Sequence, residues 1–132
     1  MKEPESVEDL GLEHEYHNLA NDYFAIEEYD KAIEHYTKAL NIRPTLKESY
    51  FNRSLAYVRK EDFSKALADL DKVIELNGEL AEAYFARGLL HEHSSRLEKA
   101  IDDYTRALDI DPGYSDAFNQ RKVALTKKTK SN

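Results

Sequence analysis

The stretch Tyr29-Asp30-Lys31-Ala32-Ile33 recurs twice in related form, and this repetition indicates the class of fold. Its counterparts are Phe63-Ser64-Lys65-Ala66-Leu67 and Leu97-Glu98-Lys99-Ala100-Ile101, so that each step is 34 residues long. A fixed period of this length is typical of repeat proteins, in which every repeat is one supersecondary unit. The period divides the chain of 132 residues into an acidic leader (1–12), three repeats (13–46, 47–80 and 81–114) and a final segment (115–130).

Other positions align in the same frame. The aligned sets are an aromatic column (Tyr16, Tyr50, Tyr84, Phe118), a small-residue column (Ala20, Ser54, Gly88), an alanine column (Ala32, Ala66, Ala100) and a closing proline or glycine (Pro44, Gly78, Pro112). Apolar residues recur with helical spacing twice in each repeat. The spacing predicts first helices near 13–26, 47–60 and 81–94, and second helices near 30–43, 64–77 and 98–111. Asp30 and Ser64 are expected to be N-caps of second helices.

These columns resemble the tetratricopeptide repeat family, as three repeats followed by a terminal capping helix. The resemblance implies an all-α fold, an α-solenoid of seven helices in stacked antiparallel pairs that wind into a right-handed superhelix. It also implies a concave groove, lined by the first helices, that binds a peptide or helix of a partner. Because one helix pair cannot bury its apolar face alone, stacking of the repeats is required.

Composition narrows the class of function. The chain has no cysteine, few glycines and prolines, and 34% charged residues, which argues against a β-fold rich in turns and against thiolate chemistry. No uncharged stretch approaches the roughly 18 residues that a membrane helix needs, and the N-terminus does not read as a signal peptide. The net charge of −7 disfavours nucleic acid. We therefore expect a cytoplasmic protein without nucleic-acid or membrane partners.

The charge is unevenly distributed. Residues 1–15 carry one basic and six acidic side chains, a net charge of −5, whereas residues 117–132 carry five basic side chains and no acid. This asymmetry suggests weak head-to-tail self-association, which salt would screen.

No catalytic motif is present, so the protein is predicted not to be an enzyme and to need no cofactor or metal. The alternative is a metal held by His14 and His17 with Glu13 or Glu48 as a third ligand. The arginines Arg53, Arg87 and Arg121 recur at the repeat period, as do Asp69 and Asp103. We interpret them as interhelical ion pairs, with a basic surface for an acidic ligand as the alternative.

The groove is the predicted binding site. Its predicted residues are His17, Asn18, Asn21, Phe24, Phe51, Asn52, Leu55, Arg59, Phe85, Leu89, Asn119 and Val123. Four of them, Phe51, Leu55, Phe85 and Leu89, are expected to be surplus to the core and to anchor an amphipathic ligand. The asparagines offer donors and an acceptor to a peptide backbone.

Two other functions stay open at this stage. Many three-repeat members of the family are co-chaperones that grip the C-terminal carboxylate of heat-shock chaperones. Asn21 and Asn52 match the two asparagines of that clamp, whereas its basic positions fall on His17, Glu82 and Ala86. The second alternative is a self-assembling scaffold.

Overall fold

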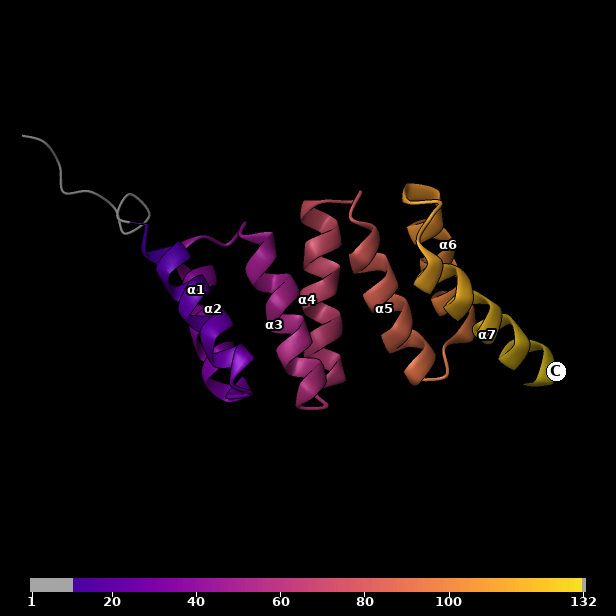
Figure 1. Ribbon diagram of the computed structural model, residues 1–132, viewed down its shortest axis with the longest axis horizontal. Helices are drawn as coiled ribbons and strands as arrows, with labels where there is room; N and C mark the ends of the chain where they lie inside the picture. The colour runs from indigo at the N-terminus through magenta and orange to yellow at the C-terminus, as the bar shows by residue number, and fades with distance from the viewer. Residues whose placement is uncertain (1–10, 132) are drawn as a thin grey trace, which may run out of the picture. The chain divides into compact units, whose positions relative to one another are not determined.

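The computed structural model describes residues 11–131, and this part of the chain forms seven α-helices and no strand (Figure 1). The helices are α1 (Leu12–Ala25), α2 (Tyr29–Ile42), α3 (Lys47–Arg59), α4 (Phe63–Leu76), α5 (Ala81–His93), α6 (Leu97–Ile110) and α7 (Ser115–Ser131). The predicted all-α fold and the seven helices are confirmed, with bounds that agree to about one residue. None of these helices is both long and apolar enough to cross a membrane.

The helices fall into two compact units. The first ends at Lys72 and the second begins at Val73, so that α4 contributes to both. In the first unit α2 packs against α1 and against α3, and in the second unit α6 packs against α5 and against α7.

The turn between the two helices of each repeat has the same backbone geometry every time. Glu27, Glu61 and Ser95, which are 34 residues apart, adopt left-handed φ values of 64°, 60° and 62°. The next residue of each turn donates its N–H five residues back, as from Glu28 to the carbonyl of Tyr23. This Schellman pattern ends the first helix and reverses the chain.

The predicted N-caps are wrong. Asp30 and Ser64 lie inside α2 and α4, because these helices begin one residue earlier than expected. Glu28, at the start of α2, makes no capping hydrogen bond through its side chain. At the start of α4 the carboxylate of Asp62 accepts the N–H of Lys65 at 3.4 Å, so the capping residue is Asp62.

Small residues let the helices of a pair approach closely, as the alignment predicted. Ala20 of α1 and Ala32 of α2 are fully buried against the ring of Tyr36. In the second unit a Cβ atom added to Gly88 would lie 2.6 Å from the Tyr104 ring. Glycine is therefore required at this position for the observed packing of α5 on α6.

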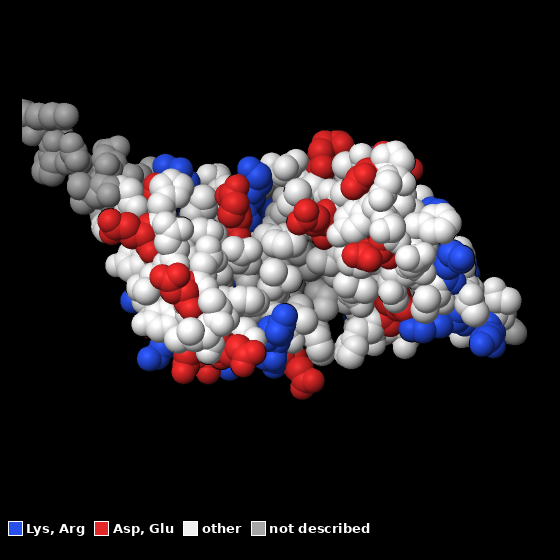
Figure 2. Space-filling model, viewed as in Figure 1, with Lys and Arg blue, Asp and Glu red and all other residues white. Residues whose placement is uncertain are grey.

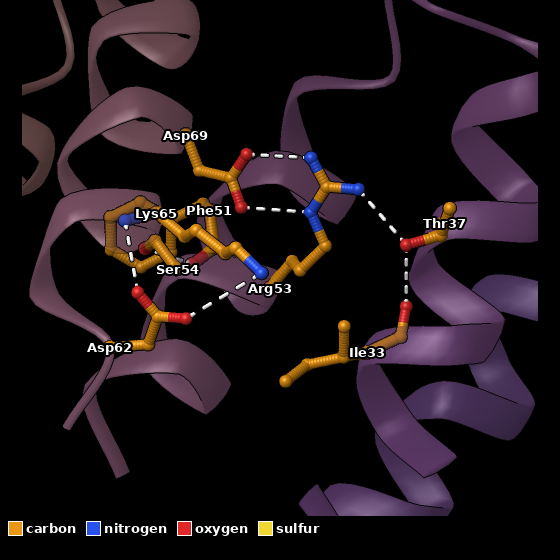
Figure 3. A network of polar contacts seen from close by, with 8 residues as sticks. All are labelled: Ile33, Thr37, Phe51, Arg53, Ser54, Asp62, Lys65 and Asp69. Atoms are coloured by element: carbon orange, nitrogen blue, oxygen red, sulfur yellow. Dashed lines mark hydrogen bonds and ion pairs between the residues drawn. The ribbon is translucent and has the colours of Figure 1, made fainter. Parts of the chain in front are cut away.

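Two bidentate ion pairs join the helices of a repeat, as predicted. The guanidinium group of Arg53 on α3 donates to both carboxylate oxygens of Asp69 on α4, at 2.8 and 2.7 Å (Figure 3). Arg53 also donates to the hydroxyl of Thr37 on α2, so that it links three helices. Arg87 and Asp103 repeat the bidentate pair at 2.9 and 2.8 Å. Asp69 and Asp103 are nearly buried, so removing either arginine would leave a carboxylate without a partner and largely shielded from water.

A buried carboxylate fastens α7 to the second unit. Glu92 of α5, 9% exposed, accepts hydrogen bonds from the hydroxyl of Tyr104 at 2.8 Å and from the amide of Gln120 at 3.1 Å. It also accepts the ammonium group of Lys127 at 2.6 Å. Residues of α5, α6 and α7 thus meet at one side chain.

Helix α7 aligns with the first helices of the three repeats, but it lacks the small residue that they share. Lys122 occupies the position of Ala20, Ser54 and Gly88, and it is exposed where those residues are buried. Its ammonium group lies 5.7 Å from the centre of the Phe118 ring. A long charged side chain at this position keeps another helix from packing closely on this face of α7.

Candidate functional site

The first unit contains a cavity of about 220 Å³. It is lined by Asn21 and Phe24 of α1, Tyr36 of α2, and Asn52 and Leu55 of α3. The sequence predicted four of these five residues, and the structure brings them together. The cavity therefore combines polar and apolar walls within a single unit.

The polar wall is a hydrogen-bonded chain. The amide oxygen of Asn21 accepts the hydroxyl of Tyr36 at 2.5 Å and the amide N–H of Asn52 at 3.0 Å. Within residues 11–131 the amide N–H groups of Asn21 and the amide oxygen of Asn52 form no hydrogen bond, so they are available to a ligand. Burial raises the pKa of Tyr36 to about 12, so its hydroxyl remains a donor at neutral pH.

The apolar wall is held from behind. The ring of Phe24 meets the ring of Tyr29 edge-on, with centroids 5.3 Å apart. The guanidinium of Arg59 lies 5.9 Å from the centre of the Phe24 ring and contacts the Tyr29 hydroxyl at 3.4 Å. These contacts fix the Phe24 ring beside Leu55 in the cavity wall.

His17 is neutral in this setting. Its Nδ1 is 2.7 Å from the hydroxyl of Ser49, and its ring lies against Tyr36 with centroids 5.6 Å apart. Burial lowers the pKa of His17 and outweighs the nearby carboxylate of Glu48, which raises it. His17 therefore supplies no positive charge at neutral pH. Among the described residues no group of three histidine or acidic side chains could hold a metal, so His14 and His17 lack a third ligand there.

The other predicted residues of the first unit do not line this cavity. Asn18 is exposed on α1, and Phe51 is half-buried on α3. Tyr36 was missed because its column was assigned to the core, where its ring indeed lies, while its hydroxyl reaches the cavity. The hydroxyl group of a tyrosine in the core column was the feature of the sequence that could have indicated this role, because a buried tyrosine hydroxyl usually has a hydrogen-bond partner.

In the second unit one prediction is wrong. Phe85 was expected to be surplus to the core, but it packs against Ala100 and Tyr104, and its ring lies 5.1 Å from that of Tyr114. Leu89 is 39% exposed, as a groove residue would be.

Asn119 and Val123 instead lie on a shallow, solvent-open surface formed by α7 alone. The other residues that line it are Lys122, Thr126, Lys127 and Lys130. The sequence had identified these lysines only as part of a basic tail.

The comparisons with known proteins agree with the repeat frame. The tetratricopeptide repeat family matches residues 15–46 and 51–115. The first TPR of Spaghetti (RPAP3) bound to the HSP90 peptide SRMEEVD is similar at 29% identity, with a TM-score of 0.86 over 90% of this chain and 94% of that one. The first TPR domain of human RPAP3 is 31% identical, with a TM-score of 0.81 over 92% and 98% of the two chains. MamA is 26% identical, with a TM-score of 0.85 over 89% and 68%. No curated protein sequence matches the chain. These similarities confirm the α-solenoid class that the repeat predicted.

Proposed function

Because the chain belongs to the tetratricopeptide repeat family, we propose that it is a non-catalytic protein–protein interaction module whose first unit binds an amphipathic segment of a partner protein. One observation carries the proposal. The cavity beside Asn21 and Asn52 combines unused amide groups with the apolar side chains of Phe24 and Leu55. Such a cavity suits a peptide whose backbone bonds to the amides while one apolar side chain fills the space.

The chemistry of the cavity favours a segment without a free carboxylate. None of the five lining residues is charged, and the neighbouring His17 is neutral at pH 7. A buried carboxylate needs a cation or several donors to replace its hydration. A peptide bond needs only one donor and one acceptor, and the two asparagines supply both.

The expected affinity for a single short peptide is weak. Burying one large apolar side chain contributes roughly 1.5–3 kcal/mol, and each backbone hydrogen bond adds about 1 kcal/mol. Association and ordering of the peptide offset much of this gain. These gains sum to about 3.5–5 kcal/mol before that offset, so a single short segment is expected to bind with a dissociation constant of about 1 mM or weaker.

A second candidate ligand is an acidic C-terminal tail of a chaperone. The observation that favours it is the similarity to an RPAP3 domain bound to an HSP90 peptide, together with the matching asparagines. The residues at the basic clamp positions oppose it, since they are Glu82, Ala86 and the neutral His17. An acid in place of a clamp lysine would repel a carboxylate.

A peptide panel tests the proposal. The probes are labelled SRMEEVD with a free C-terminus and an amphipathic peptide with blocked termini, and the readout is fluorescence anisotropy. We expect the blocked peptide to bind more tightly, and Asn52→Ala and Leu55→Ala each to weaken it by about tenfold. Asn18→Ala is the matched control, because Asn18 is exposed and lies outside the cavity. Tight binding of SRMEEVD that is lost on amidation of its C-terminus would replace the proposal with the clamp function.

A further inference from the structure

The exposed side of α7 is both basic and apolar. Lys122, Lys127 and Lys130 lie on its open surface together with Val123, which is 43% exposed. On the face shown in Figure 2 basic side chains gather over α7, the yellow end of the ribbon in Figure 1. Phe118 and Leu125 of the same helix, 48% and 45% exposed, are not among the residues that line this surface. We call Asn119, Lys122, Val123, Thr126, Lys127 and Lys130 the α7 surface.

Two of its lysines are available to a ligand. The ammonium group of Lys127 is already held by Glu92 at 2.6 Å. Lys122 and Lys130, in contrast, form no ion pair within residues 11–131. Lys122 is next to Val123 in the sequence, and Lys130 follows Val123 two helical turns later, so the apolar side chain has two ammonium groups near it that carry no ion pair within the described residues. A complementary ligand carries carboxylates around a small apolar side chain.

We propose that the α7 surface binds the acidic leader, residues 1–10, of a second copy of this protein. The leader lies outside the described residues, but its sequence has the complementary pattern. Its acids are Glu3, Glu5, Glu8 and Asp9, and they surround the apolar residues Val7 and Leu10. The nearby Glu13 is excluded from this role because it is buried and paired with Arg43 at 3.2 Å.

The contact is heterologous, since the leader of one molecule meets α7 of the next. The resulting pair still presents one free leader and one free α7 surface, so that association continues rather than ending at a dimer. Exposed ion pairs contribute little individually, which makes the contact weak. Screening beyond about 10 Å at 0.1 M salt makes it strongly salt-dependent.

Sedimentation velocity of the full chain tests the contact. We expect the weight-average mass to rise progressively with concentration at about 0.01 M salt and to return to the monomer value at about 0.3 M. Lys122→Glu/Lys130→Glu is expected to abolish the rise. Lys31→Glu/Lys65→Glu is the matched control, because it makes the same charge change at exposed positions of the first unit. Lys127 is left in place, so that its bond to Glu92 is preserved.

A mixing experiment identifies the occupant. One variant carries glutamine in place of the four leader acids, and the other carries Lys122→Glu/Lys130→Glu. Each variant alone is expected to be monomeric, whereas a mixture at low salt forms a dimer that cannot grow. A mixture that stays monomeric overturns the proposal, and so does an unmodified chain that stays monomeric at low salt, which is the result expected if the leader binds α7 of its own chain. Equal association by the control pair and by the α7 pair overturns it as well. Circular dichroism confirms that every variant is folded, and the peptide assay on the first unit is independent of these outcomes.

Discussion

Replacing Glu92 by alanine is expected to loosen α7 more than any single surface change. The substitution removes the acceptor of three donors, those of Tyr104, Gln120 and Lys127, at distances of 2.8, 3.1 and 2.6 Å. The Tyr104 hydroxyl would be left without its partner in a side chain that is 0% exposed. A hydrogen bond to a charged group is worth about 1.5–3 kcal/mol, and the exposed lysine adds less than about 1 kcal/mol. We therefore expect a loss of about 3 kcal/mol.

Related substitutions separate the contributions. Glu92→Gln keeps an acceptor for Tyr104 and should cost about 1 kcal/mol, and Lys127→Ala should cost at most about 1 kcal/mol. Tyr104→Phe in the Glu92→Ala background removes the orphaned hydroxyl, so the double variant should be more stable than the sum of the two single losses predicts.

Urea denaturation followed by far-UV circular dichroism measures these differences. Hydrogen exchange resolved by peptide should show the loss of protection concentrated in α7. Additive losses in the double variant, or a loss below about 0.5 kcal/mol for Glu92→Ala, would refute the reasoning that this carboxylate fastens the helix.

The same site predicts an acid dependence. Burial alone would raise the pKa of Glu92, but hydrogen bonds from Lys127, Gln120 and Tyr104 outweigh it and lower the pKa below the ordinary 4.5. A lowered folded-state pKa means that the stabilisation is complete above pH 4.5 and is lost as the pH falls through the folded value. Glu92→Gln should therefore flatten the stability profile below pH 4.5.

Three further changes follow from the packing. Arg53→Ala leaves the nearly buried carboxylate of Asp69 without its partner, and denaturation should show a loss of about 3 kcal/mol; a loss below 1 kcal/mol would mean that water replaces the pair. Gly88→Ala places a Cβ 2.6 Å from the tyrosine ring on α6 and should cost about 1–3 kcal/mol, whereas Gly113→Ala, with its nearest neighbour at 3.7 Å, should change the melting behaviour little. Burial lowers the pKa of His91, so unfolding takes up a proton and stability should fall as the pH drops below 6.5; the fall should be smaller in His91→Gln, and an unchanged slope would contradict the assignment.

The repeat period explains why the fold could be predicted almost residue by residue. Small residues at Ala20 and Gly88 and the arginine–aspartate columns specify both where helices lie and which faces meet. The first residues of the second helices were harder to predict. Asp30 and Ser64 are typical capping residues, but the preceding turn is determined by a residue with left-handed φ, and the helix begins before them. No glycine marks that position, so composition gave no signal for it.

The site could be predicted only in part. Asn21, Phe24, Asn52 and Leu55 were identified because helical spacing puts them on one face. Tyr36 was missed, since a buried ring and a hydroxyl that reaches a cavity belong to the same side chain. Phe85 was misassigned because spacing does not reveal how far a neighbouring ring, here that of Tyr104, extends toward it.

Lys122 has a consequence for engineering longer arrays from this scaffold. Appending a copy of the sequence of α2 or α6 after α7 would not by itself create a fourth repeat, because the incoming helix would meet a charged side chain where Ala20 and Gly88 leave room. Changing Lys122 to alanine first would open the helix to modular extension, with Phe118 and Leu125 already present to receive the added element. A single substitution, Lys122→Ala, is therefore the first step in designing a longer array.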